Sequence, residues 1–234
     1  MVAISEFTRS WTKRYWGVDA SVVYPPVALA TSELPKQNTI VSVGRFAVLG
    51  HKKRHPELIE TFARTGLRQR GWSYECVGAV GRSQDDLDYF RLVKDLAEGA
   101  GVNVRGNVSR LELNRLYGSA KIFMHAAGYG ELEDTPELNE HFGISTVEAM
   151  SAGCIPLVIA KGAQPEIVEH GKNGFVWNTL PELEQYLRWL NDDDARRKQM
   201  SAAAKQRARA FDRGRFVDEM MTLLGLEPVP PRAT

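Results

Sequence analysis

The sequence lacks a long hydrophobic run and an excess of either charge. None of its apolar stretches approaches the ~20 residues that a membrane-spanning helix needs, and its first residues do not resemble a signal peptide. Thirty Lys and Arg against 29 Asp and Glu leave a net charge of +1, so bulk charge favours neither nucleic acid nor an anionic membrane. We therefore expect a cytoplasmic protein, with peripheral association at the inner face of a membrane left open.

Cysteine is also scarce. Cys76 and Cys154 are the two cysteines of the chain, and both stand in apolar, strand-like contexts. Two cysteines so placed form neither a disulfide framework nor a metal site, so we expect buried free thiols in a reducing compartment. With 234 residues, 43% hydrophobic and 25% charged, the composition is that of an ordinary globular protein of one large or two small domains.

Short apolar segments alternate with helical patterns from about residue 39 onward. We expect strands at 39–43, 73–79, 102–105, 120–125, 154–159 and 174–177. We expect helices at 56–70, 84–100, 109–118, 143–152, 164–169, 180–190, 194–210 and 213–224. This alternation predicts an α/β fold with a doubly wound, Rossmann-like parallel sheet and a ligand site at the carboxyl ends of the strands.

The first residues predict a different arrangement. A helix is expected from near Ser5 to Gly17, with extended chain on either side of it. Pro25 and Pro26 fix a stiff extended segment, and the polar stretch 27–38 has the composition of a linker.

Two glutamates, Glu140 and Glu148, bracket the segment Glu-His-Phe-Gly-Ile-Ser-Thr-Val-Glu. Gly143 interrupts the chain before a strong helical pattern, so Glu140 falls in a loop and Glu148 falls on the helix. A helix start leaves backbone N–H groups unpaired, and its dipole favours an anion there. Two carboxylates with free amides between them suit a ligand that carries both hydroxyls and phosphates, such as a nucleotide sugar.

Further motifs follow in a fixed order. The segment above is followed by Ala-Met-Ser-Ala-Gly-Cys-Ile-Pro and Pro-Glu-Ile-Val, and it is accompanied by Val-Gly-Arg-Phe at 43–46, His-Lys-Lys at 51–53 and Gly-Lys-Asn-Gly-Phe at 171–175. Together they resemble the donor-binding half of the retaining glycosyltransferases called group 1, or family 4, from about Thr39 to about Leu224. One departure is Ala163, which stands where the family usually has a glycine before Pro-Glu-Ile-Val.

The resemblance implies a domain organisation. Members of the family have two facing domains, the GT-B fold, in which the first holds the acceptor and the second holds the donor. Residues 1–35 would then be a remnant of the N-terminal domain and linker, and residues 36–234 the nucleotide-sugar-binding Rossmann-like domain. The chain would be a fragment, or a subunit that needs a partner; an intact small protein with an N-terminal arm is the alternative.

Two basic residues stand at the expected mouth of the site. Arg45 follows the strand 39–43, and Lys53 precedes the next helix. A guanidinium fork and an ammonium point charge can together neutralise a diphosphate, and the resemblance implies that role for both residues. Lys52 competes with Lys53, but the distance of Lys53 from the Leu-Ile-Glu at 58–60 matches the family pattern better.

The resemblance also implies roles for the Glu140–Glu148 segment. Glu140 is expected beside the transferred sugar, as the catalytic residue. Glu148 is expected to accept hydrogen bonds from both ribose hydroxyls, which suits a carboxylate with two acceptor oxygens. The main chain at Phe142, Gly143 and Ile144 is expected to hold sugar hydroxyls and phosphate.

Other strand ends supply weaker candidates. His125 ends the strand 120–125, where a subset of the family resembling mannosyl and related polysaccharide enzymes also carries His; a structural hydrogen-bonding role is the alternative. The family contacts the nucleobase from turns that match Gly78 and the segment Gly106-Asn107-Val108. Ordinary strand-to-helix turns would explain these four residues equally well.

Acidic and basic clusters have plainer explanations. The loop 131–137 is rich in carboxylates and suggests a mobile lid, and Asp192–Asp194 suggests a helix cap rather than a metal motif. Because the resembled enzymes are metal-independent, we expect no metal and no cofactor besides the nucleotide sugar as substrate. The basic run 51–55 lacks interleaved aromatics, so nucleic acid is not an expected partner.

The sequence thus predicts a hexosyltransferase domain that binds a nucleotide-diphosphate sugar for polysaccharide or glycoconjugate synthesis. His125 and the long acidic loop favour GDP-mannose or a related donor. The acceptor, a saccharide or lipid-linked saccharide, would come through a missing N-terminal domain or partner subunit, so the isolated chain is expected to bind donor but transfer poorly. A sugar-nucleotide epimerase and a non-catalytic nucleotide-sugar-binding scaffold remain alternatives.

Overall fold

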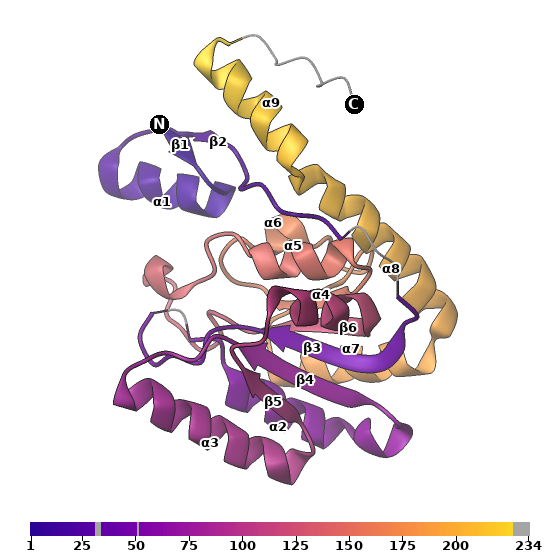
Figure 1. The fold of residues 1–234 in the computed structure, drawn as a ribbon. Coiled ribbons are helices and arrows are strands. Elements are labelled where there is room, and N and C mark those ends of the chain that lie inside the picture. Colours follow the sequence, from indigo (N-terminus) through magenta and orange to yellow (C-terminus); the bar gives the residue numbers. More distant parts are fainter. Residues whose placement is uncertain (31–33, 51, 227–234) are drawn as a thin grey trace.

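A parallel sheet of six strands organises most of the chain in the computed structural model, which describes residues 1–30, 34–50 and 52–226 (Figure 1). The strand order is β5-β4-β3-β6-β7-β8. The strands are β3 (Gln37–Val43), β4 (Ser73–Gly78), β5 (Asn103–Gly106), β6 (Ala120–His125), β7 (Ile155–Ile159) and β8 (Phe175–Trp177). The predicted α/β fold with a doubly wound parallel sheet is confirmed.

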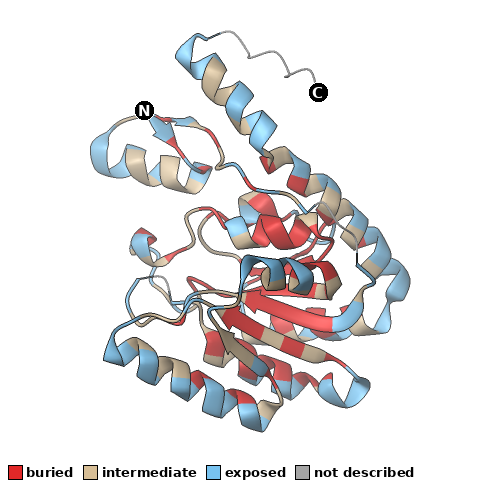
Figure 2. Ribbon diagram, viewed as in Figure 1, coloured by how far each residue is buried: buried red, intermediate tan, exposed pale blue. Residues whose placement is uncertain are grey.

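Helices cover both faces of the sheet because its central strands are apolar on both sides. Ile40 packs into a core under one set of helices, and its neighbour Val41 packs into a core under the other set. The first set is α2 (His55–Thr65), α3 (Gln84–Ala100) and α7 (Leu180–Asp192). The second set is α4 (Arg110–Ser119), α5 (Ile144–Ser151) and α8 (Asp194–Ala208). The buried residues form a layer between these helices and the sheet (Figure 2).

Local capping fixes where several helices begin. Ser109 caps α4 and Asp193 caps α8 through side-chain oxygens, as the sequence predicts. The acidic run 192–194 therefore caps a helix. Cys76 and Cys154 are buried free thiols, as expected.

Some predicted boundaries are wrong. The helix expected at 56–70 ends at Thr65, because Gly66 adopts a left-handed conformation, and only a short 3-10 turn, η1 (Arg68–Arg70), follows. The strand expected from residue 39 begins at Gln37, inside the stretch assigned to a linker. The helix expected at 164–169 is the short α6 (Gln164–Ile167). Residues 31–33 of that linker lie outside the described part of the chain.

The first 24 residues form a separate small unit, which we call the N-terminal unit (residues 1–24). It contains β1 (Val2–Ala3), α1 (Glu6–Trp16) and β2 (Ser21–Val22), and the two short strands pair in parallel. Ser5 caps α1 and Gly17 ends it, as predicted. Figure 1 shows this unit outside the layers of the main sheet, beyond α5 and α6, with α9 (Arg213–Leu224) extending past α8 on the same side.

Among the helices that the structure describes, none is both long enough and apolar enough to cross a bilayer.

Candidate functional site

The sheet changes direction between β3 and β6. The chain leaves β3 toward β4 on one side and leaves β6 toward β7 on the other. Loops that diverge in this way leave a crevice at the carboxyl ends of the two strands, where doubly wound proteins bind ligands. A cavity of about 550 Å³ lies there, which we call the switch-point cavity. Its lining includes Arg45, Lys53, Gly78, Glu140, Gly143 and Ile144.

Gly78 allows the loop after β3 to pass close to the end of β4. A Cβ atom on Gly78 would lie 1.7 Å from the carbonyl oxygen of Gly44, a distance that no side chain could occupy. The next turn is fixed by Phe46, whose N–H donates to the Ala79 carbonyl at 2.8 Å. Arg45 lies between these two anchors, on the wall of the cavity and exposed to solvent.

Two side chains meet at the Glu140 carboxylate. Lys53 Nζ donates to Glu140 Oε2 at 2.5 Å, and His125 Nε2 lies 3.1 Å from the same oxygen. The loop before α2, the end of β6 and the loop before α5 therefore converge on one point. His125 Nδ1 is buried, and no other described group bonds to it. Lys53, predicted to bind the phosphates, and Glu140, predicted to bind the sugar, are thus in direct contact.

The protonation states follow from these contacts. Burial raises the pKa of Glu140, but the His125 hydrogen bond and the Lys53 charge outweigh it and hold that pKa below its ordinary value. Burial lowers the pKa of His125 despite its carboxylate partner. Glu140 is therefore ionised at neutral pH, and a neutral His125 with its proton on Nε2 donates to it.

The start of α5 faces the same cavity. Gly143 precedes α5 with a φ of 118°, and no described side chain caps the helix. The first amides of a helix have no intrahelical partner, and those of Ile144 and Ser145 belong to cavity-lining residues. Gln164 stabilises this turn because its Nε2 donates to the Phe142 carbonyl at 3.2 Å. The sequence did not indicate Gln164, since its contacts depend on a neighbouring loop.

Glu148 lies one turn further along α5 and faces a different cavity. This second cavity, of about 260 Å³ between α4 and α5, is lined by Glu148, Arg110, Asn114 and Tyr117, and by Leu29 of the segment before β3. Glu148 is 9% exposed, and its Oε1 accepts a hydrogen bond from Arg110 at 2.8 Å. The predicted acidic pair is therefore divided between two neighbouring cavities on one helix. Arg110 was not anticipated.

The residues assigned to the nucleobase form a turn at the end of β5. Asn107 adopts a φ of 55°, and its N–H donates to the Gly78 carbonyl at 2.8 Å. Its Oδ1 accepts from the Val80 N–H at 3.0 Å, and a Cβ on Gly106 would clash with Val80. Val108 is partly buried against the core beneath α4. This turn ties β5 to β4 at Gly78, which lines the switch-point cavity.

The charged loops are engaged in other contacts. Glu131 of the acidic loop pairs with Arg54 at 2.5 Å. Lys52 lines a third cavity that Lys53 does not line, which supports the choice of Lys53 for the switch-point cavity. His51 lies outside the described residues. Within those residues, no group of three or more His, Cys, Asp or Glu side chains could hold a metal ion.

His55, the first residue of α2, makes the stability of the fold depend on pH. Its ring stacks on Phe46 at 4.4 Å, its Nδ1 lies 3.1 Å from the Tyr89 hydroxyl, and burial lowers its pKa to about 4. The unfolded chain binds the proton at an ordinary pKa of about 6.5. Protonation therefore favours unfolding as pH falls from about 6.5 to about 4, and this group alone removes about 3 kcal/mol of stability over that interval.

Urea unfolding between pH 4 and pH 7 measures this effect. The stability of His55→Gln is expected to vary less with pH than that of the wild type, whereas His170→Gln, which alters an exposed histidine, is expected to keep the wild-type dependence. Equal pH dependence in His55→Gln and the wild type would contradict the assignment.

Comparisons with known proteins give a family match and several relatives. Residues 30–207 match the family described as glycosyl transferases group 1. The GDP-Man:Man(3)GlcNAc(2)-PP-Dol alpha-1,2-mannosyltransferase of Dictyostelium discoideum is 26% identical over 231 residues, covering 90% of this chain and 43% of that protein. The alpha-1,3/1,6-mannosyltransferase alg-2 of Neurospora crassa is 25% identical over 260 residues, covering 93% of this chain and 53% of that protein. The chain thus spans about half the length of these relatives.

Solved structures share the fold. Anabaena HepE in complex with UDP superposes with a TM-score of 0.79 at 18% identity, covering 96% of this chain and 63% of that one. Sucrose-phosphate synthase from Thermosynechococcus elongatus gives a TM-score of 0.76 at 18% identity, covering 96% of this chain and 57% of that one. The sheet is therefore one Rossmann-like half of a GT-B architecture, as predicted. Because the family match extends over well more than half of the sequence, this chain belongs to the group 1 glycosyltransferases.

Proposed function

We propose that the chain is the nucleotide-sugar-binding domain of a retaining glycosyltransferase and that its donor occupies the switch-point cavity. The observation that carries this proposal is the meeting of Lys53, His125 and Glu140 beside the uncapped start of α5. Cationic groups for a diphosphate, backbone amides for its oxygens and a carboxylate for sugar hydroxyls share one cavity. Such a combination matches the chemical groups of a nucleoside-diphosphate sugar.

The diphosphate lies between Arg45, Lys53 and the amides at residues 143–145 in this proposal. Arg45 offers a planar fork of donors and Lys53 a mobile point charge, and the dipole of α5 adds a partial positive charge. These groups stabilise the negative charge that develops on the diphosphate as its bond to the anomeric carbon breaks. Arg45, Lys53 and the start of α5 together supply the positive charge that faces the diphosphate in this proposal.

Glu140 and His125 lie on the sugar side of the diphosphate. Ionised Glu140 is an acceptor for sugar hydroxyls, and the close Lys53 ion pair keeps it near the reacting carbon. The route of attack is taken over from the family that the chain belongs to. An acceptor hydroxyl attacks the anomeric carbon on the face that the diphosphate leaves, and its proton passes to the departing diphosphate oxygen.

The nucleoside extends from the diphosphate toward the second cavity. Glu148 accepts hydrogen bonds from the ribose hydroxyls, and Arg110 holds the carboxylate from the opposite side. The buried Tyr117 hydroxyl, which has no hydrogen-bond partner among the described residues, faces the same space. The nucleobase lies against Gly78 and the turn at 106–108.

We propose GDP-mannose as the donor and a lipid-linked saccharide as the acceptor. The names of several relatives specify GDP-Man, a mannosyl transfer and a PP-Dol acceptor. Residues 1–35 are then the remnant of an N-terminal domain and linker, and a complete acceptor site requires that domain or a partner subunit. The corresponding place of action is the inner face of a membrane, where the chain would associate peripherally from the cytoplasm.

Titration calorimetry of the chain with GDP, UDP and ADP tests the proposal. We expect micromolar binding of GDP and weaker binding of the other two. If none of the three nucleotides bound at millimolar concentration, the proposal would be contradicted and a non-catalytic scaffold would be favoured.

A turnover assay of the isolated chain tests whether it can transfer the sugar to an acceptor by itself. With GDP-mannose and an oligosaccharide acceptor we expect little or no transfer, because this proposal assigns the acceptor site to an N-terminal domain or a partner subunit. Rapid transfer by the isolated chain would show that it carries its own acceptor site.

A further inference from the structure

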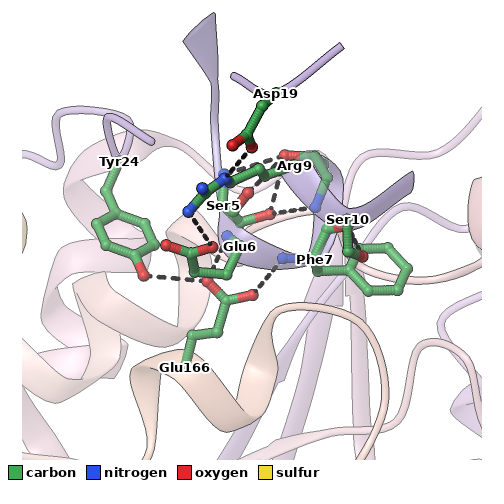
Figure 3. A network of polar contacts seen from close by, with 9 residues as sticks. Ser5, Glu6, Phe7, Arg9, Ser10, Asp19, Tyr24 and Glu166 are labelled. Carbon is green, nitrogen blue, oxygen red and sulfur yellow. Dashed lines mark hydrogen bonds and ion pairs between the residues drawn. The ribbon is translucent and has the colours of Figure 1, made fainter. Parts of the chain in front are cut away.

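The motif Pro165–Val168 contains a glutamate that donor binding leaves unexplained. Glu166 lies on α6, and its carboxylate reaches the first turn of α1, 160 residues away in the sequence. Its Oε2 accepts from the Glu6 N–H at 2.8 Å and from the Tyr24 hydroxyl at 3.0 Å, while its Oε1 accepts from the Phe7 N–H at 2.7 Å. Figure 3 shows the carboxylate pointing at the start of the helix.

These bonds complete the cap of α1. Ser5 already accepts from the N–H of Thr8, so its side chain satisfies the third amide of the helix. Glu166 satisfies the first two amides and adds an anion at the positive end of the helix dipole. Burial and the Glu166 charge raise the pKa of Tyr24 to about 12, so the Tyr24 hydroxyl stays protonated and donates. The start of α1 therefore depends on Glu166, a residue outside the N-terminal unit.

The segment that carries Glu166 is also tied to the switch-point cavity. The Ala163 N–H donates to the Glu140 carbonyl at 2.9 Å. Gln164 accepts from the Thr146 hydroxyl at 2.9 Å and donates to the Phe142 carbonyl. Residues 163–166 thus contact the loop of Glu140 at one end and α1 at the other.

The N-terminal unit in turn contributes to the cavity wall. Ile4, directly before the cap of α1, lines the switch-point cavity together with Pro25. The Phe7 ring lies 6.1 Å from the His141 ring, next to Glu140. None of the α1 residues is buried, so apolar packing holds the helix only weakly and the three Glu166 bonds matter more.

We propose that Glu166 is a positioning residue that holds the N-terminal unit against the donor cavity and couples its position to donor occupancy. This inference rests on the proposed function, since the ligand of the cavity is the donor. Coupling of this kind is reciprocal. If bound donor stabilises the docked position of the N-terminal unit, docking of that unit must raise the affinity for the donor by the same factor. Loss of the Glu166 bonds would free the unit and weaken donor binding.

Hydrogen exchange of the full chain, with and without GDP, tests this coupling. Glu166→Gln keeps the side-chain shape but removes the charge and turns an amide group toward backbone donors. We expect the amides of residues 6–8 to exchange about 10-fold faster than in the wild type, with β3 and β6 unchanged. GDP should slow exchange in α1 of the wild type but not in α1 of Glu166→Gln, whose affinity for GDP should fall several-fold.

Two further variants separate positioning from general destabilisation. Glu169→Gln makes the same charge change three residues away, where the carboxylate pairs with Lys172, and should behave as the wild type does. Tyr24→Phe removes one of the three donors while retaining the carboxylate, so a smaller acceleration is expected.

Unchanged exchange in α1 of ligand-free Glu166→Gln would overturn the inference, as would equal protection of α1 by GDP in the variant and the wild type. Failure of the proposed function has a different signature. In that case GDP would leave residues 143–148 of the wild type unprotected, whatever the Glu166 variants do.

Discussion

Replacement of Lys53 by methionine is expected to weaken GDP binding about 10- to 100-fold. A charge-assisted hydrogen bond contributes about 1.5–3 kcal/mol, and each 1.4 kcal/mol is a tenfold change in the dissociation constant. The loss should lie at the upper end, because Lys53 also neutralises Glu140. Without the ammonium group, an incoming diphosphate would meet an unscreened carboxylate. Titration calorimetry with GDP measures the change.

Lys52→Met provides the matched control. The two lysines are neighbours in one loop, but Lys52 lines a different cavity from Lys53. Its replacement should leave the GDP dissociation constant within about twofold of the wild type, allowing for a small loss of long-range attraction. Equal losses in the two variants would mean that the loop acts through net charge, and a larger loss in Lys52→Met would mean that the diphosphate lies elsewhere.

Replacement of Gly78 by alanine is expected to destabilise the fold by about 3 kcal/mol and to reduce GDP binding at the same time. The new methyl group would lie 1.7 Å from the Gly44 carbonyl oxygen, which belongs to backbone and cannot rotate away. Relief requires the loop after β3 to move, and that loop carries Arg45. Urea unfolding measures the stability, and calorimetry at a temperature where the variant is folded measures the binding.

Gly99→Ala shows what the same change does where there is room. Gly99 lies on α3, and a Cβ there would meet no atom within 4 Å. Because alanine restricts the unfolded chain and favours helix, this variant should be more stable than the wild type by about 0.5–1 kcal/mol. If Gly78→Ala unfolded at the wild-type urea concentration, the close approach of β3 and β4 would not be a constraint on the site.

The fold was largely predictable because its signals are local. Most strands contain a short apolar segment, and such segments alternate with helical patterns along the chain. The errors lie where local signals mislead. Leu67 continues the apolar period of α2, but Gly66 ends the helix before it. Gln37 is polar because the start of β3 is exposed, so composition alone suggested a linker.

The candidate site was predictable in part for a related reason. Arg45, Gly78 and His125 each follow or end a strand, and parallel strands bring their carboxyl ends to one edge. Residues of other helices and strands that contact the site could not be recognised from the local sequence. Arg110 reaches Glu148 from 38 residues away, and Ile4 reaches the switch-point cavity from the N-terminal unit. Such contacts depend on how loops and helices pack, which no spacing in the sequence specifies.

The division of the acidic pair refines the sequence hypothesis. Arg45, Lys53 and Glu140 line one cavity, whereas Glu148 lines another, one helical turn away on α5. A ligand that contacts all four must extend along α5, with its anionic centre at the start of the helix and a hydroxyl-bearing group beside Glu148. A nucleoside diphosphate carries its anionic and hydroxyl-bearing groups in that arrangement.

A crystal structure of the chain with GDP would test the central claim most directly. We expect the diphosphate oxygens within hydrogen-bonding distance of Arg45, Lys53 and the amides at 143–145, with the ribose hydroxyls on Glu148. A diphosphate bound away from the start of α5, or a ribose turned away from Glu148, would contradict the assignment of this cavity to the donor.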